Sequence, residues 1–172
     1  MSENITRAVC RHLQIPDHIV KAALKDFRRP KGRLNFFELG AIKVVDDSYN
    51  ANPLSMKLGL DTLAEAAAQT KRRLAVLGFM AELGDEAPAY HSEVGAYARS
   101  RADVVVGVGE LAKHYDPDYW FACSEACSRE IERIVCSGDC LLVKGSASAR
   151  MYVVVDKLKE IAKQWIGQIS AG

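Results

Sequence analysis

A short polar stretch, VVDDSYNANPLSM (residues 44–56), holds the residue types best suited to contact a ligand. It follows an apolar run and ends in Asn52 and Pro53, which suit the N-cap and first turn of a helix. In an open α/β sheet, a loop at the carboxyl end of a strand faces the ligand crevice. The candidate ligand-facing residues are Asp46, Asp47, Tyr49, Asn50 and Asn52. The alternative is a polar turn whose Asp and Asn side chains only cap the helix.

Two more loops carry groups that could recognise charges. GFMAELGDE contains Glu82, which could pair with an ammonium group. KGSAS follows an apolar run and is predicted to open the last helix, so Ser146 and Ser148 could offer N–H and hydroxyl donors to a carboxylate beside Lys144. The simpler alternatives are a hydrated glutamate and a serine-capped helix start.

Alternating β-rich and helical segments are expected to position these loops. Strands are predicted in AIKVVDD, which is taken as the first strand, and in RRLAVLG, ADVVVGVG, DYWFA and CLLVKG. Helices are predicted over 53–68, 88–101, 124–135 and 150–165. Near-continuous apolar strands separated by amphipathic helices indicate a mostly parallel sheet covered on both faces. The expected fold class is α/β, with an open, Rossmann-like sheet.

The first residues differ in pattern from this α/β region. ITRAVCRHLQIPDHIVKAALKDF predicts two short helices broken at Pro16, and the basic stretch RRPKGR follows it. We therefore expect a short helical segment plus linker over residues 1–30 and the α/β domain over residues 31–172.

Composition excludes several classes of protein. A chain of 172 residues with 49% hydrophobic residues can bury one ordinary core, and a formal net charge of +1 gives no nucleic-acid signal. Its apolar runs are too short to cross a bilayer, and MSENITRAVC lacks the apolar core of a signal peptide. A cytoplasmic protein without membrane insertion is expected.

Three further motifs favour packing over chemistry. The spacing C-x3-C occurs twice, but it falls on a predicted helix and at the start of an apolar strand, so we assign no metal site. The run GVGELA fits G-x-G-x-x-A, yet it follows a middle strand and leads into a short helix. His91 is expected to be a packed histidine rather than a base.

The segments DDSYNANPLSM, LAVLGFMAELGDEAPAYHSEVG and LLVKGSASARM together resemble the C-terminal domain of the Mur ligases, especially the branch that adds D-alanyl-D-alanine in peptidoglycan synthesis. Residues 5–27 resemble the helical end of that family's central ATPase domain. The resemblance implies an amide-forming ligase that uses ATP and Mg2+ to make an acyl phosphate, which an amine then attacks. The implied substrates are UDP-MurNAc-tripeptide and D-alanyl-D-alanine.

The resemblance also implies roles for individual residues. Arg33 in GRLNF would reach the nucleotide phosphates, Asp47 would lie near the ribose, and Tyr49 would line the same edge. For Arg33 the alternative is a solvated linker charge. The residues expected to bind the peptide substrates are Asn50, Asn52, Glu82, Lys144, Ser146 and Ser148. No catalytic residue is assigned.

No G-x-x-x-x-G-K-[ST] motif occurs, so this chain alone is expected not to transfer phosphate. ATP and Mg2+ would be bound mainly by the family's central domain, and the chain would work only with the N-terminal and central domains. The sequence also departs from the family at Phe79, Ala147 and Tyr152, where Asp, Arg and Glu are common. Loss of an arginine at 147 removes a possible carboxylate contact. The alternative is therefore a free-standing, non-catalytic α/β binding module.

Overall fold

The computed structural model describes residues 2–27, 30–67 and 72–169. Two compact units make up the chain, residues 1–30 and residues 31–172. In the first unit, α1 (Ser2–His12) and α2 (Asp17–Asp26) are separated at Pro16, which confirms the predicted pair of short helices. An ion pair between Arg7 and Asp17 joins them. Among the described residues, no helix combines the length and the apolar character needed to span a membrane.

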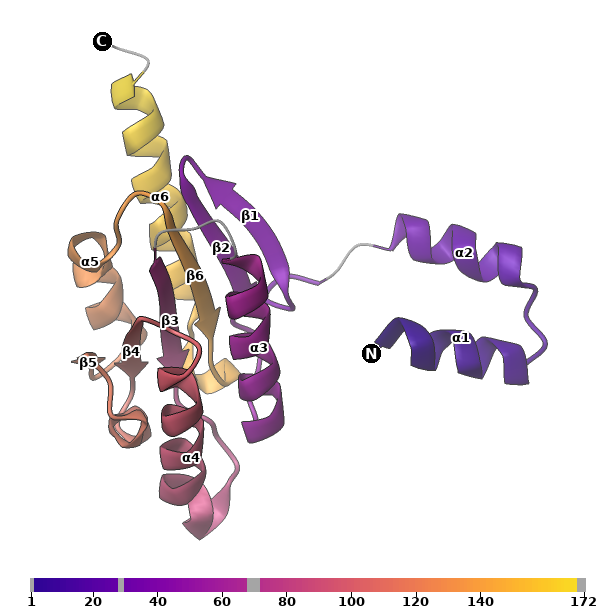
Figure 1. Ribbon diagram of the computed structural model, residues 1–172, viewed down its shortest axis with the longest axis horizontal. Helices are drawn as coiled ribbons and strands as arrows, with labels where there is room; N and C mark the ends of the chain where they lie inside the picture. Colours follow the sequence, from indigo (N-terminus) through magenta and orange to yellow (C-terminus); the bar gives the residue numbers. More distant parts are fainter. Residues whose placement is uncertain (1, 28–29, 68–71, 170–172) are drawn as a thin grey trace. The chain divides into compact units, whose positions relative to one another are not determined.

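The second unit is built on a six-stranded sheet with the order β1-β2-β6-β3-β4-β5 (Figure 1). The strand β1 pairs antiparallel with β2, and every other neighbouring pair is parallel. This arrangement confirms the expected open, mostly parallel α/β sheet. The strand bounds are β1 (Asn35–Leu39), β2 (Ile42–Asp47), β3 (Arg72–Gly78), β4 (Val104–Val108), β5 (Tyr119–Phe121) and β6 (Asp139–Lys144).

Helices cover both faces of the sheet, as the apolar runs predicted. Alternate residues of each buried strand point to opposite faces, so Val44 and Val45 belong to different cores. One core lies under α3 (Pro53–Ala66) and α4 (Ala87–Arg99), and the other under α5 (Ser124–Ile134) and α6 (Tyr152–Ile169). Burial on both faces explains why these strands are apolar throughout.

Two details of the prediction were wrong. AIKVVDD does form a strand, β2, but it is not the first one, because Asn35–Leu39 forms an edge strand before it. This edge strand was missed because its residues are alternately half-buried and exposed, without a continuous apolar run. The last helix begins at Tyr152 rather than at Arg150, after a 3-10 turn over Ala147–Ala149. Ser146 makes no side-chain cap there, so the serine-capped helix start was also wrong.

Candidate functional site

The register of the parallel strands brings three loops to one edge of the sheet. Asp47 at the end of β2 pairs with Lys144 at the end of β6, and Lys144 also pairs with Leu77 near the end of β3. The loops that follow β2, β3 and β6 therefore start side by side at the carboxyl edge. In sheets of this kind, that edge is where ligands bind.

A buried ion pair joins two of the predicted site residues. Lys144, which is only 2% exposed, donates from Nζ to Asp47 Oδ2 at 2.5 Å and to the Asn50 carbonyl at 2.9 Å. The other carboxylate oxygen of Asp47 accepts a hydrogen bond from the Leu34 N–H at 3.1 Å. The pair thus connects β6, the loop after β2 and the segment before β1. A ligand hydroxyl could use only the remaining lone pairs of Asp47.

The two asparagines of the polar stretch hold the loop and the helix that follows. Asn52 Oδ1 accepts from Ser55 N at 2.8 Å, and Ser55 Oγ accepts from Asn52 N at 3.0 Å. This reciprocal capping box confirms Asn52 as the N-cap of α3, with Pro53 in the first turn. Asn50 Oδ1 accepts from the Ala51 N–H at 2.8 Å. Both amide oxygens therefore serve the local turn in this structure.

Ser146 connects all three loops. Its N–H donates to the Phe79 carbonyl at 3.0 Å, and its hydroxyl accepts from the Ala81 N–H at 2.7 Å. The hydroxyl also contacts the Ala51 carbonyl at 3.5 Å. Ser146 is buried, whereas Ser148 and Glu82 are exposed on neighbouring loops. Ser146 therefore holds the backbone of the loops after β2 and β3 at the carboxyl edge of the sheet. Ser148 and Glu82 face solvent, where a ligand could reach them.

The three residues expected to contact ATP surround one turn. The guanidinium carbon of Arg33 lies 4.2 Å from the centre of the Tyr49 ring, and both side chains are exposed. Gly32 accepts a hydrogen bond from Tyr49 N at 2.9 Å and has a φ of +69°, and a β-carbon there would lie 2.9 Å from the same nitrogen. Glycine is therefore required at this position. The next residue, Leu34, donates its N–H to the Asp47 carboxylate, and this hydrogen bond keeps the backbone beside Arg33 close to Asp47.

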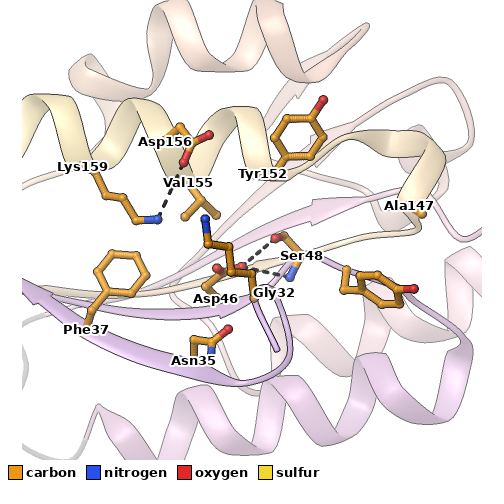
Figure 2. Close-up of a pocket in the computed structure, with 12 residues that line it drawn as sticks. Gly32, Asn35, Phe37, Asp46, Ser48, Ala147, Tyr152, Val155, Asp156 and Lys159 are labelled. Carbon is orange, nitrogen blue, oxygen red and sulfur yellow. Dashed lines mark hydrogen bonds and ion pairs between the residues drawn. The ribbon is translucent and has the colours of Figure 1, made fainter. Parts of the chain in front are cut away.

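A cavity of about 520 Å³ lies beside this turn, between the β1–β2 hairpin and α6 (Figure 2). Its lining includes Asp46, Tyr49, Ala147 and Tyr152, and the last two are positions where the sequence analysis expects a departure from the family it resembles. Sequence reasoning missed its other lining residues, among them Phe37 and Lys159. Phe37 lies on the edge strand that was not predicted, and a lysine on a helix gives no signal of which strand it faces.

His91 is buried under this edge and holds the loop after β3. Its Nε2 accepts a hydrogen bond from Met80 N at 2.9 Å, so that nitrogen carries no proton, and Nδ1 donates to the Ala87 carbonyl at 2.6 Å. The ring lies 5.0 Å from the Tyr115 ring, and the Tyr115 hydroxyl donates to the Gly78 carbonyl. The prediction of a packed histidine is confirmed. Burial lowers the pKa of His91 below its usual value.

This lowered pKa predicts acid-sensitive stability. The unfolded chain binds a proton on His91 more readily than the folded chain does. The contribution of neutral His91 to the free energy of unfolding is therefore fully present above about pH 6.5. Below that pH the free energy of unfolding falls, by up to about 1.4 kcal/mol per pH unit. Urea unfolding between pH 5 and 8 measures the slope. A His91→Gln variant should lose much of it, while His18→Gln, at an exposed position, should keep it. Equal slopes in all three proteins would contradict the assignment.

Two of the five cysteines pack in the core of the sheet domain. All five are free thiols; Cys127 and Cys140 are buried, and burial raises the pKa of Cys127 to about 12. Cys123 and Cys136 are exposed. Within residues 2–27, 30–67 and 72–169, no three His, Cys, Asp or Glu side chains gather as ligands for a metal ion.

Comparison with known proteins identifies relatives of this fold and site. The family described as "Mur ligase, glutamate ligase domain" matches residues 32–147. A UDP-N-acetylmuramoyl-tripeptide--D-alanyl-D-alanine ligase of Escherichia coli is 35% identical over 149 residues, which are 82% of this chain and 32% of that protein. The enzyme of the same name from Mycobacterium tuberculosis is 36% identical over 146 residues, or 68% of this chain and 28% of that protein.

Solved structures show the same relationship. A MurF crystal structure from Acinetobacter baumannii has a TM-score of 0.77 and 26% identity, and the match covers 89% of this chain and 35% of that one. MurF ligase from Thermotoga maritima in complex with ADP shares the fold with a TM-score of 0.75 at 24% identity, over 91% and 36% of the two chains. The chain spans about a third of the length of these relatives. Because the family match covers more than half of the sequence, the chain belongs to the Mur ligase family and contains its glutamate ligase domain.

Proposed function

We propose that this chain contributes the third domain of an ATP-dependent ligase that joins D-alanyl-D-alanine to UDP-MurNAc-tripeptide through an acyl phosphate. The observation that carries the proposal is the carboxyl edge of the sheet, where the Arg33–Tyr49 stack, Asp47 and the loops tied by Ser146 come together. The activity named for the relatives, UDP-N-acetylmuramoyl-tripeptide--D-alanyl-D-alanine ligase, supports the choice of substrates.

The geometry suits a domain that closes over a nucleotide held by another domain. Arg33 carries a permanent charge, and stacking on Tyr49 limits the directions in which its guanidinium fork points. Such a fork can bind phosphate oxygens in two places at once. The described residues offer no cluster suited to Mg2+, so no step of this chemistry is assigned to a metal held here.

Residues 1–30 are proposed to be the helical end of the central ATPase domain. The two helices and the residues that directly follow them expose large apolar side chains, as expected of a surface that another domain covers: Ile5, Val9, Leu13, Ile19 and Phe27. The structural match to MurF from Thermotoga maritima covers 91% of the chain, which is more than residues 31–172 make up. The likeness therefore extends into this helical unit.

Complementation tests the proposed function. The chain is mixed with, or fused behind, the N-terminal and central domains of a D-alanyl-D-alanine ligase, and amide formation is measured with both substrates and ATP. We expect activity that depends on D-alanyl-D-alanine and on both parts. Replacing the phosphate-loop lysine of the supplied domain is the negative control. A folded fusion without activity would instead favour the non-catalytic binding module, consistent with the changes at Ala147 and Tyr152.

Arg33→Ala is expected to raise the KM for ATP in that reconstituted ligase. Loss of one charge-assisted phosphate contact corresponds to about a tenfold effect, roughly 1.4 kcal/mol, with little change in the KM for the dipeptide. Steady-state kinetics with each substrate varied measures both constants. Arg133→Ala, which removes an exposed arginine of α5 paired with Glu130, is the matched control. An unchanged KM for ATP would remove the phosphate role of Arg33.

A further inference from the structure

The loop between β3 and α4, residues 79–86, is held at the carboxyl edge by side chains from two other elements (Figure 1). The Met80 N–H donates to Nε2 of His91 on α4 at 2.9 Å. The next N–H along the chain, that of Ala81, donates to Ser146 Oγ at 2.7 Å. Two consecutive backbone donors of this β3–α4 loop therefore depend on side chains that are distant in the sequence.

The residue that follows these two contacts has an unusual backbone. Glu82 has a φ of +61°, in the left-handed region that residues other than glycine seldom adopt. Its side chain is exposed, and no described residue binds its carboxylate. A backbone of this kind persists only where the surrounding structure fixes it. The hydrogen bonds of Met80 and Ala81 supply that constraint, so the place of the Glu82 carboxylate at the edge depends on them.

Only the contact made by His91 can be lost by protonation. The neutral ring donates from Nδ1 to the Ala87 carbonyl at 2.6 Å, which leaves the lone pair of Nε2 for the Met80 N–H. A protonated imidazole carries an N–H on both nitrogens and has no acceptor. The two N–H groups would then point at each other, and the buried Met80 N–H would have no partner. The protonated ring and the closed loop are therefore incompatible.

The surroundings of His91 offer nothing to stabilise its protonated form. Its side chain is 0% exposed. The titratable groups that face it are Tyr115, whose ring centre lies at 5.0 Å, and His114, both from the 3-10 turn Leu111–Tyr115. Among the described residues of α4 and of the β3–α4 loop, no carboxylate acts on the ring. Burial lowers the pKa of His91, so the ring is neutral and the loop closed at neutral pH.

We infer that His91 is a positioning residue and a pH-sensitive latch: its neutral ring holds the β3–α4 loop and the strained Glu82 in place, and its protonated ring releases them. The release is local, because the parallel pairing of β3 with β6 and β4 does not involve the ring. This inference rests on the contacts of the loop and not on the proposed ligase activity.

NMR of the whole chain tests the latch. The nitrogen shifts of the His91 ring at pH 7.5 should show a proton on Nδ1 and none on Nε2. Hydrogen exchange of the Met80 amide is then followed between pH 5 and 8 and corrected for the intrinsic pH dependence of exchange. Below about pH 6.5, the protection of this amide should fall by up to about tenfold per pH unit.

Urea separates local opening from global unfolding. A local opening exposes little surface, so low urea concentrations should leave the exchange of Met80 unchanged. Leu142 is the reference, because it lies in the centre of the sheet, pairs with Val45 and Ala75, and is 0% exposed. Its amide should be better protected than that of Met80 and should exchange faster as urea is added.

Variants separate the hydrogen bond from the packing of the ring. His91→Gln supplies an acceptor oxygen that does not titrate in this range, so the protection of Met80 should no longer depend on pH. His91→Leu fills the space without an acceptor, and should lower that protection about tenfold even at pH 7.5 and shift the resonances of Glu82. His18→Gln, at an exposed position, should match the parent. If His91→Leu fails to fold, the parent and His91→Gln still decide the question.

Four results would overturn the inference: a proton on Nε2 at pH 7.5, protection of Met80 that does not change with pH in the parent, the same pH dependence in His91→Gln as in the parent, or equal urea dependence at Met80 and Leu142. These results do not bear on complementation, which is measured at neutral pH with the loop closed. A chain that fails to complement can still have the latch.

Discussion

Asp47→Ala is expected to destabilise the α/β unit by about 3–5 kcal/mol, because it leaves the ammonium of Lys144 buried without its counter-ion. Lys144 is 2% exposed and has Asp47 and the Asn50 carbonyl as partners, and its stem lies beside the buried Gly59 of α3. The ammonium therefore has little access to water in place of the carboxylate. Urea unfolding at neutral pH, followed by circular dichroism, measures the loss.

A double variant distinguishes the cost of an unpaired charge from the value of the pair. When a buried pair is replaced on both sides by apolar residues, the change is often near neutral. We therefore expect Asp47→Ala with Lys144→Met to recover most of the stability lost by Asp47→Ala alone. The exposed pair Arg133–Glu130 is the control, and removing either partner should cost less than about 1 kcal/mol. Equal losses in the single and double variants would show that the charge is not the cause.

The buried pair also affects how kinetic data are interpreted. Asp47 is both a candidate ribose contact and a structural partner of Lys144, so lower activity of Asp47→Ala has two possible sources. Arg33 is exposed and stacks on Tyr49, so its removal changes the surface with little effect on packing. Arg33→Ala is therefore the cleaner test of nucleotide binding.

Gly95→Ala is expected to destabilise the same unit by about 3 kcal/mol or more, at the upper end of the cost of overpacking. A β-carbon at position 95 of α4 would lie 2.5 Å from the backbone of Tyr115, and backbone atoms cannot rotate away. The gain in helix propensity, about 1 kcal/mol, is too small to offset this. The segment around Tyr115 would have to shift, which would weaken its contacts with His91 and Gly78.

Gly59→Ala is the matched control, because it also adds one methyl group to a helix facing the core. There the nearest atom is Cδ of Lys144 at 3.0 Å, a side-chain atom that has to give by only a few tenths of an ångström, whereas at position 95 the backbone itself has to move. We expect this variant to remain within about 1 kcal/mol of the parent, since propensity and crowding nearly cancel. Thermal unfolding of both variants measures the contrast. Similar losses at the two glycines would mean that backbone approach at Tyr115 is not the reason for glycine at 95.

Local patterns accounted for much of the fold. Continuous apolar runs predicted β3 and β6 because both faces of these strands are buried, and Asn52 with Pro53 predicted the start of α3 because capping involves neighbouring residues. The edge strand β1 was missed, since half-exposed residues leave only a weak alternation. The 3-10 turn before α6 was missed because its sequence also suits a helix start.

The site depended far more on tertiary structure. The sequence by itself placed polar residues at the ends of strands, and thereby predicted which loops could bind a ligand. It could not show that Lys144 pairs with Asp47 or that Ser146 ties three loops, because strand order and register decide which loops meet. It also could not show that Asp46 and Lys159 line one cavity. Alternation along a strand and turns along a helix are local properties, whereas a cavity exists only where a particular helix packs on a particular pair of strands.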